Sequence, residues 1–163
     1  ASVLATDLYL SKEQAEALGV ELVDLERVMR ESDIVTIHVP LLPSTRGLIG
    51  EREIGMMKPT AYLVNTSRGP VIDEKALIKA LQEGRIAGAG LDVFAQEPIP
   101  PDNPLLKMEN VTLTPHIGGV TEQSIIRTAR RVAEEAARMA RGEPPMTIVN
   151  KAQLEAKGYK IPS

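Results

Sequence analysis

The sequence predicts an α/β fold, built on a parallel sheet that helices cover on both faces. Short, continuous apolar runs alternate with helix-like stretches, and each run ends in polar or proline-containing residues. Continuous apolar runs are typical of parallel strands that are covered on both faces. Six runs are expected to form strands: residues 3–6, 20–23, 34–39, 61–64, 87–93 and 111–114.

Capping residues mark the helices between these runs. Ser11, with Gln14 three residues later, has the pattern of a capping box, and Gly19 is expected to end that helix. Asp73 is expected to cap a second helix, which stops near Gly84. The order strand, helix, strand therefore recurs along the chain.

The last part of the chain has a different character. Residues 121–141 are expected to form one long helix, which Gly142 and the prolines after it terminate. We therefore expect two parts, an α/β domain in residues 1–120 and a C-terminal segment in residues 121–163.

The long helix is rich in arginine, which raises the question of a nucleic-acid site. Glu134 and Glu135, however, follow Arg130 and Arg131 by four residues, so these charges are expected to neutralise one another on the helix surface. The net charge of −3 and the aromatic content of 2% also argue against nucleic-acid binding.

Composition limits the classes of function further. The 163 residues contain 43% hydrophobic and 25% charged residues, as in ordinary globular proteins. There is no cysteine, so disulfides, thiol catalysis and cysteine-bound zinc are excluded. No run of 18 apolar residues predicts a membrane span. We expect a cytoplasmic protein with no metal site. We also expect that the chain begins at a cut rather than at a natural N-terminus.

Arg68 stands at the mouth of a buried strand, in the stretch LVNTSRGPVID. A guanidinium does not lose its charge and is poorly tolerated in an apolar core unless an anion meets it. Its partner is therefore either a nearby carboxylate or a ligand.

Other reactive residues follow later strands, in GLDVFAQEP and TPHIGG. A histidine backed by a glutamate is an acid–base catalyst, and a guanidinium can hold a carboxylate with two parallel hydrogen bonds. Glu97 and His116, taken with Arg68, therefore predict a site in which the anion bound by Arg68 is a substrate.

Residues near the earlier strand ends are candidates for a cofactor cleft. Asp7 follows the first strand, where an acidic residue accepts hydrogen bonds from a ribose, or it is a solvated turn residue. No GxGxxG motif occurs in the sequence. His38 either lines a cleft or is structural, and Thr45 either binds a phosphate or caps a turn.

The three stretches LVNTSRGPVIDEKAL, AGLDVFAQEP and LTPHIGG, in this order, resemble the D-isomer-specific 2-hydroxyacid dehydrogenases. The resemblance implies an NAD-dependent oxidoreductase of small 2-oxo and 2-hydroxy acids. It makes Arg68 the ligand of the substrate carboxylate and carbonyl, His116 the general acid and base, and Glu97 the residue that orients His116 and favours its charged form.

The resemblance implies that residues 1–120 are an incomplete dinucleotide-binding domain, a Rossmann-like, doubly wound parallel sheet. It also implies the cofactor site. Asp7 would bind the ribose, Asp92 would contact the nicotinamide carboxamide, and the segments 39–45 and 65–68 would line the cleft. The cofactor-binding residues so implied are Asp7, His38, Val39, Pro40, Thr45, Asn65, Thr66, Ser67, Asp92, Gly118 and Gly119. A homodimer is expected for the intact protein.

The sequence also departs from the family pattern. The family has an N-terminal substrate domain, a first nucleotide-binding strand and a glycine-rich loop, which do not occur in these 163 residues. A strand in TIVN, residues 147–150, would lead back toward the substrate domain. The first strand is central in the sheet order 3-2-1-4-5-6. We expect another polypeptide to supply it; otherwise its neighbours pair directly, or one half is displaced or exchanged with another copy. The chain alone is expected to be inactive.

Two other functions fit parts of this pattern. One is an NAD-sensing interaction protein of the C-terminal-binding-protein corepressor type, which keeps similar site residues. The other is a formate dehydrogenase, which pairs its histidine with glutamine rather than with a residue like Glu97. Among enzyme substrates, glyoxylate, hydroxypyruvate and 3-phosphoglycerate remain open.

Overall fold

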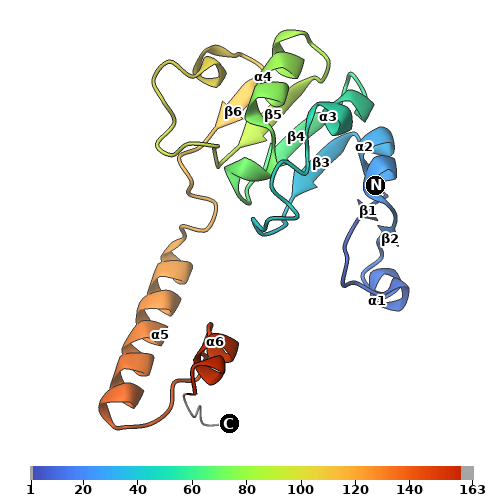
Figure 1. Cartoon of the computed structure of the whole chain (residues 1–163). Coiled ribbons are helices and arrows are strands. Elements are labelled where there is room, and N and C mark those ends of the chain that lie inside the picture. Colours follow the sequence, from blue (N-terminus) through green and yellow to red (C-terminus); the bar gives the residue numbers. More distant parts are fainter. Residues whose placement is uncertain (1, 159–163) are drawn as a thin grey trace. The chain divides into compact units, whose positions relative to one another are not determined.

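Residues 2–158 are described by the structure, a computed structural model. The chain divides into two units, Ala1–Gly118 and Gly119–Ser163. The first unit contains all the strands of the described chain and the candidate site, and the second contains the two last helices (Figure 1).

Five of the six predicted runs contain a strand, and the run 61–64 overlaps β4, which extends to Asn65; every strand pair is parallel. The strands are distributed over two sheets, one of order β1-β2 and one of order β3-β4-β5-β6. They are β1 (Leu4–Ala5), β2 (Glu21–Leu22), β3 (Ile34–Ile37), β4 (Tyr62–Asn65), β5 (Gly88–Leu91) and β6 (Val111–Leu113). The predicted α/β fold with parallel strands is confirmed.

The two sheets are not joined to one another. β1 and β3 are the strands expected to flank the missing first strand of the sheet. They do not pair within the described residues, so the alternative in which they pair directly is wrong. A direct pairing would have satisfied their backbone groups on that side. Ile34, on β3, is 65% exposed, as expected of a residue on a strand with one open edge.

Four short helices connect the strands: α1 (Lys12–Ala17), α2 (Leu25–Glu31), α3 (Glu51–Met56) and α4 (Glu74–Gln82). The predicted caps are confirmed, because Ser11 and Gln14 form the capping box of α1 and Asp73 accepts hydrogen bonds at the start of α4. Gly84 ends that region with φ of 63°, a conformation that favours glycine. The sequence analysis did not identify α2 or α3.

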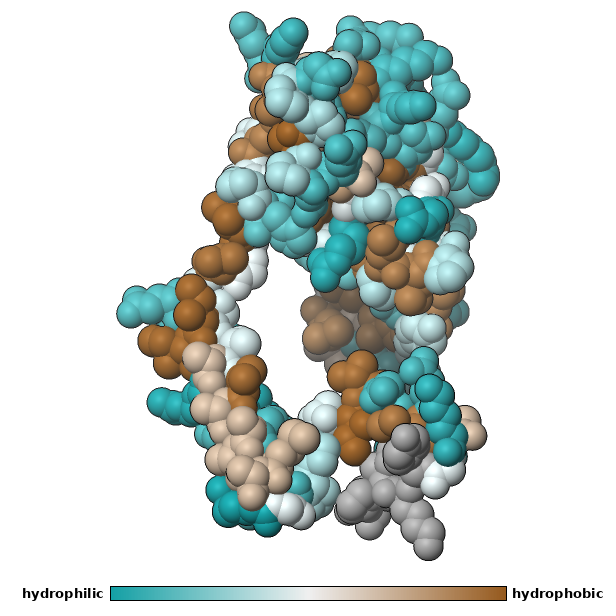
Figure 2. Space-filling model, turned by 60° about the vertical axis from the view of Figure 1, so that its left-hand side comes forward, coloured by the Kyte–Doolittle hydropathy of each residue, from teal (hydrophilic) through white to brown (hydrophobic). Residues whose placement is uncertain are grey.

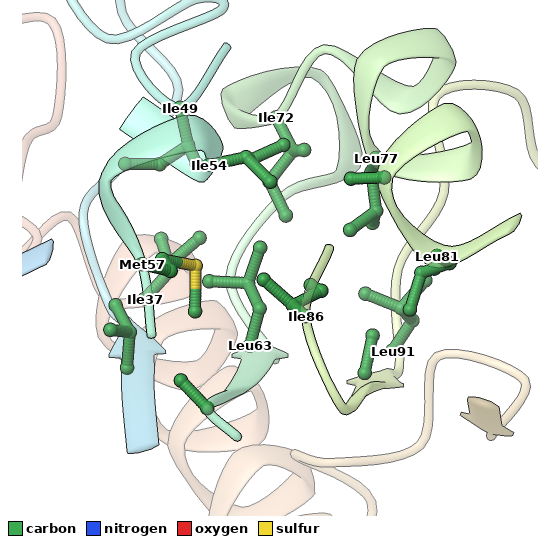
Figure 3. Close-up of a cluster of buried hydrophobic side chains, with 14 of the residues drawn as sticks. Ile37, Ile49, Ile54, Met57, Leu63, Ile72, Leu77, Leu81, Ile86 and Leu91 are labelled. Atoms are coloured by element: carbon green, nitrogen blue, oxygen red, sulfur yellow. The ribbon is translucent and has the colours of Figure 1, made fainter. Parts of the chain in front are cut away.

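One continuous hydrophobic core lies between the four-stranded sheet and its helices. Figure 3 shows side chains of β4, α3 and α4 that point toward one another, among them Leu63, Ile54, Leu77 and Leu81. All four are buried. The core therefore anchors α4 on the sheet, beside the strand end where Arg68 emerges.

In the second unit, α5 (Glu122–Ala140) confirms the predicted long helix, with Thr121 as its cap. No residue of α5 is buried, and apolar surface is open along the helix (Figure 2). Its exposed apolar side chains include Ile125, Ile126, Val132 and Met139. None of the helices in residues 2–158 is long and apolar enough to cross a membrane.

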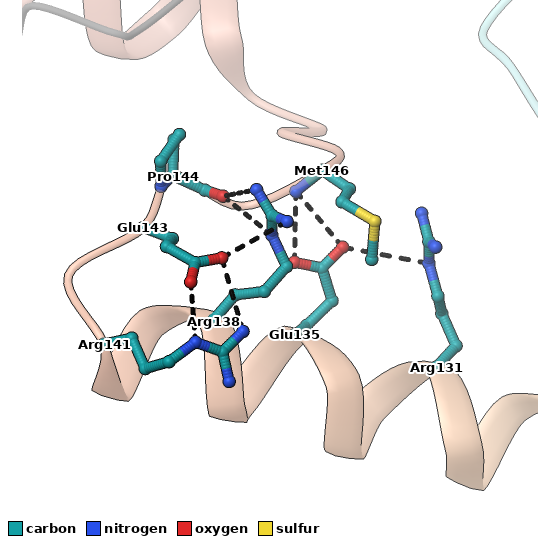
Figure 4. Close-up of polar contacts among 7 residues, drawn as sticks. All are labelled: Arg131, Glu135, Arg138, Arg141, Glu143, Pro144 and Met146. Atoms are coloured by element: carbon teal, nitrogen blue, oxygen red, sulfur yellow. Dashed lines mark hydrogen bonds and ion pairs between the residues drawn. The ribbon is translucent and has the colours of Figure 1, made fainter.

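The arginines at the end of α5 are largely engaged by local partners (Figure 4). Arg131 pairs with Glu135 at 3.8 Å, as predicted, whereas no ion pair joins Arg130 to Glu134 within the described chain. Arg138 donates two hydrogen bonds to the Pro144 carbonyl, and Arg141 pairs with Glu143 at 2.6 Å. These contacts fix the turn that follows the helix.

The predicted strand at residues 147–150 is wrong. Those residues are irregular and lead into a short helix, α6 (Lys151–Ala156), that the sequence analysis did not identify. A strand needs a partner to accept and donate its ladder hydrogen bonds, and no strand of the described second unit offers one.

Truncation of a core side chain on α4 is expected to destabilise the first unit. Leu77→Ala should lower the free energy of unfolding by about 2–5 kcal/mol, because Leu77 is 1% exposed and its loss leaves a cavity. Leu106→Ala, at a residue 46% exposed, is the matched control and should change it by less than about 0.5 kcal/mol. Urea unfolding of both variants measures this, and equal effects would contradict the prediction.

Candidate functional site

The candidate site lies at the carboxyl edge of the four-stranded sheet. Parallel register pairs Asn65 with Leu91 and Leu91 with Leu113, so the residues that follow these strands emerge side by side. Open α/β sheets bind ligands at this edge. Arg68, Asp92 and the turn that carries His116 follow the three aligned strands.

Asn65 organises the turn in which Arg68 lies. It is 1% exposed, and its Oδ1 accepts hydrogen bonds from the N–H of Ser67 at 3.0 Å and the Ser67 hydroxyl at 2.9 Å. Its Nδ2 donates to the Arg68 carbonyl at 3.1 Å. Both polar ends of this buried amide are therefore used to shape the turn.

Arg68 itself is exposed, with its Nη1 donating to the neighbouring Ser67 carbonyl at 2.7 Å. Within residues 2–158 it forms no ion pair with a carboxylate, although it is near enough to Glu97 for its charge to help lower the pKa of that carboxyl.

Asp92 holds the turn that carries His116. The Asp92 carboxylate is buried and accepts hydrogen bonds from the Thr114 hydroxyl at 2.5 Å, the Ile117 N–H at 2.9 Å and the Gly118 N–H at 2.8 Å. His116 between them adopts φ of 56°, the left-handed conformation that residues other than glycine rarely adopt. The carboxylate compensates this local strain.

The hydrogen bonds determine the charge state of Asp92. Burial of the carboxyl tends to raise its pKa, but the three donors, together with the nearby charge of His116, outweigh burial and hold the pKa below its ordinary value of 3.8. Asp92 is therefore a carboxylate at neutral pH, the form that can accept from all three groups.

Glu97 and His116 form a direct pair. Glu97 Oε2 lies 2.8 Å from His116 Nδ1, and Glu97 Oε1 accepts the Phe94 N–H at 3.0 Å. These hydrogen bonds, that from His116 first, lower the pKa of Glu97; the charge of Arg68 contributes in the same direction and partial burial opposes it. Among the described residues no hydrogen bond involves His116 Nε2.

Within the described residues, no hydrogen bond joins the candidate cofactor residues that follow β1 and β3 to the Glu97–His116 pair. Asp7 is exposed, and its Oδ1 accepts the N–H groups of Tyr9 and Leu10 at 2.6 and 2.9 Å, which makes it a turn residue in this structure. His38 Nε2 lies 2.9 Å from the Thr36 hydroxyl.

Thr45 has the capping geometry that the sequence left as one of two alternatives. Its hydroxyl accepts the Leu42 N–H at 2.8 Å and donates to the Pro40 carbonyl at 2.6 Å. Val39 is half-buried, and Pro40 is exposed beside it. Thr66 and Gly119 are also exposed; Thr66 belongs to the first unit, and Gly119 is the first residue of the second.

Sequence reasoning missed three residues that shape the site. Thr114 supplies a donor to Asp92, and Glu74 and Asn103 are hydrogen-bonded to one another at 2.9 Å beside the segment that carries Glu97. The sequence signal at Asn103 was the Asn-Pro pair, which favours a turn. Glu74 looked like an ordinary acidic residue in the first turn of a helix. No group of three or more acidic or histidine residues able to hold a metal occurs in the described chain.

Residues 1–118 match the family model of the D-isomer specific 2-hydroxyacid dehydrogenase, NAD binding domain. The chain is 51% identical over 155 residues to a glyoxylate reductase of Korarchaeum cryptofilum, covering 95% of this chain and 47% of that protein. It is 42% identical over 160 residues to a D-3-phosphoglycerate dehydrogenase of Archaeoglobus fulgidus, covering 98% of this chain and 30% of that protein.

A solved structure shares the fold. The NAD-complexed D-isomer specific 2-hydroxyacid dehydrogenase of Lactobacillus delbrueckii ssp. bulgaricus superimposes with a TM-score of 0.79 at 38% identity, over 92% of this chain and 49% of that one. The chain thus spans about half the length, or less, of the proteins that it matches.

The Asp92 turn generates a prediction on stability. Asp92→Asn should lower the free energy of unfolding by about 1–3 kcal/mol at pH 7, because the amide group presents N–H where the carboxylate accepts hydrogen bonds. Asp102→Asn, at an exposed loop residue, is the control and should have little effect.

The same comparison has an expected pH dependence. The folded-state pKa of Asp92 is depressed, so its stabilisation is complete above pH 3.8 and is lost as pH falls through the lower folded-state value. The difference in the free energy of unfolding between wild type and Asp92→Asn, measured by urea unfolding, should therefore shrink from pH 7 to pH 3. A difference that grows on acidification would contradict the assignment.

Proposed function

The chain belongs to the D-isomer specific 2-hydroxyacid dehydrogenase family, in its NAD-binding domain, and we propose that the whole protein interconverts small D-2-hydroxy acids and 2-oxo acids. NAD is the cofactor of this family domain. We propose further that residues 1–120 serve cofactor binding and that the chain from residue 121 onward leads into a substrate domain.

The residues of the site are suited to this reaction. When bound, NADH would supply a hydride to C2 of a 2-oxo acid, and NAD⁺ would accept a hydride from C2 of the 2-hydroxy acid. In the direction of reduction, the Arg68 guanidinium binds the substrate carboxylate and stabilises the charge that develops on the carbonyl oxygen. His116 Nε2 donates the proton to that oxygen, and in oxidation it takes the proton back.

Glu97 supports His116 in both directions. Its contact with Nδ1 fixes the orientation and the tautomer of the imidazole, which leaves Nε2 to exchange the proton with the substrate. This contact, together with an Arg68 that forms no ion pair with a carboxylate of the described residues, is the observation that supports the proposal most. Within the described residues, the Arg68 side chain forms one hydrogen bond, to the adjacent Ser67 carbonyl, and its charge stands at the same sheet edge as the acid–base pair.

The chemistry of the exposed groups also fits NAD. Both backbone hydrogen bonds of Asp7 fall on Oδ1, so Oδ2 can accept hydrogen bonds from ribose hydroxyls. The Asp92 carboxylate already accepts three hydrogen bonds, so we propose that its main part is to hold the turn of Gly118, and that any contact with the nicotinamide carboxamide is additional. His38 and the exposed segment after β3 would line the same edge.

The names of the relatives favour an enzyme over a sensing protein, since the proteins compared above are reductases and dehydrogenases. Steady-state assays of the whole protein with NADH and a panel of glyoxylate, hydroxypyruvate and 3-phosphohydroxypyruvate test the proposal directly. Turnover of at least one 2-oxo acid is expected, and NADH binding without turnover of any would favour the sensing alternative.

Arg68→Lys is expected to lower kcat/KM of the whole protein by about 100-fold although the charge is kept. Lysine cannot form the planar, two-bond contact with a carboxylate, so both the position of the substrate and charge stabilisation suffer. Arg30→Lys, at an exposed site at the end of α2, is the matched control and should retain activity. Near wild-type kcat/KM in Arg68→Lys would show that Arg68 is structural.

The Asp7 carboxylate is expected to make the whole protein prefer NADH to NADPH by at least about tenfold in kcat/KM, which corresponds to about 1.4 kcal/mol. A carboxylate accepts hydrogen bonds from a free 2′-hydroxyl and repels a 2′-phosphate. Asp7→Ser should reduce this preference. Equal kcat/KM values for the two cofactors in the wild type would refute the role given to Asp7.

A further inference from the structure

We propose that Glu74 is a positioning residue for the acid–base pair, because it fastens the segment that carries Glu97 to the first turn of α4. This inference rests on the proposed function for its consequences in catalysis. Its structural part concerns only contacts within the first unit, and can be tested without any substrate.

Glu74 binds the segment at two places. Its Oε2 accepts the Ala95 N–H at 2.8 Å, two residues before Glu97, and its Oε1 accepts Asn103 Nδ2 at 2.9 Å, six residues after it. Asn103 is 9% exposed, and its Oδ1 accepts the Leu105 N–H at 3.0 Å. The two ends of the loop around Glu97 are therefore attached to one carboxylate.

Close packing brings the Arg68 side of the site against the same segment. Gly69 is buried, and a Cβ built on it would overlap the Phe94 carbonyl and crowd the Ala95 nitrogen. Only glycine permits this approach. The cavity that Gly69 and Glu74 help to line is small, about 10 Å³. The backbone that follows Arg68 and the backbone that precedes Glu97 are thus in contact, with Glu74 beside both.

Helix capping does not account for this arrangement. Asp73 already accepts the N–H groups of Lys75 and Ala76 at the start of α4, at 3.1 and 3.3 Å. Glu74 turns its carboxylate to a different segment, 21 residues away in sequence at Ala95. Both of its partners are donors, so both of its oxygens must be acceptors, a requirement that a carboxylate meets and an amide does not.

That requirement allows a reciprocal test. In Glu74→Gln the new amide N–H₂ faces a donor, so one contact is lost. In Asn103→Asp two carboxylates face one another. When both substitutions are combined, the amide at position 74 can donate to the carboxylate at position 103 while its carbonyl still accepts the Ala95 N–H. The second oxygen of that new carboxylate still accepts the Leu105 N–H. Glu83→Gln, exposed at the other end of α4, is the control with the same change of charge.

The first measurement is amide hydrogen exchange at Ala95 and Phe94 in the 163-residue chain, alongside urea unfolding. We expect exchange at both amides to accelerate about tenfold or more in each single variant, and to return to within about threefold of wild type in the double variant. Glu83→Gln should not change it. Unchanged exchange in Glu74→Gln would overturn the proposed attachment, as would a double variant that is folded yet exchanges as fast as the single ones.

The second measurement is kcat and KM for the 2-oxo acid that the whole protein turns over. We expect Glu74→Gln to lower kcat about tenfold with less than a twofold change in KM, because Arg68 remains in place while Glu97 and His116 lose alignment. The double variant should recover most of kcat. If kcat falls only in parallel with the free energy of unfolding and does not recover in the double variant, the role of Glu74 is structural and this inference fails.

The two measurements separate this inference from the proposed function. If the wild-type whole protein reduces no 2-oxo acid, the proposed function fails, and the exchange data still decide whether Glu74 fastens the segment. If turnover is normal but exchange and kcat are insensitive to Glu74→Gln, this inference fails and the proposed function stands.

Discussion

Parallel register is the constraint on which the site depends. β4, β5 and β6 end within one residue of one another in the paired ladder, because Asn65 pairs with Leu91 and Leu91 with Leu113. Asp92 and the Thr114 segment therefore leave neighbouring strands at the same level, close enough for the Thr114 hydroxyl to reach the Asp92 carboxylate at 2.5 Å. A shift of one residue in either ladder would reverse the faces of these side chains and remove that contact.

The buried Asp92 carboxylate links the strand register to the position of His116. Three donors satisfy Asp92, which offsets the cost of placing a charge where water is excluded. Two of them are backbone N–H groups on the far side of His116, so the chain between must turn sharply, and His116 adopts a left-handed conformation. The strain at His116 is thus balanced by hydrogen bonds that belong to another strand, and the imidazole is brought to Glu97.

The parts of this arrangement that repeat along the chain were predictable from the sequence. Apolar runs indicated all six strands, and the residues Ser11, Asp73 and Thr121 marked the starts of three helices. The short α2 and α3 lack a long apolar period, so their residues were not recognised. The pairing of Glu97 with His116 was predictable as chemistry, but the φ of His116 and the contacts of Glu74 and Asn103 depend on where separate segments meet, which no local pattern encodes.

The acid–base pair and the ribose-binding candidate have different structural supports. The hydrogen bonds that orient Arg68, Glu97 and His116 are made by residues between Asn65 and Gly118, on three adjacent strands, the loops after them and the first turn of α4. Asp7 follows a strand of the separate two-stranded sheet, and its carboxylate is held only by its own turn. The orientation of the imidazole is therefore set by the protein alone, as the proposed proton transfer would require. The proposed contact of Asp7 with a ribose would depend instead on how the two sheets are connected, so we expect mutation to alter the two properties independently.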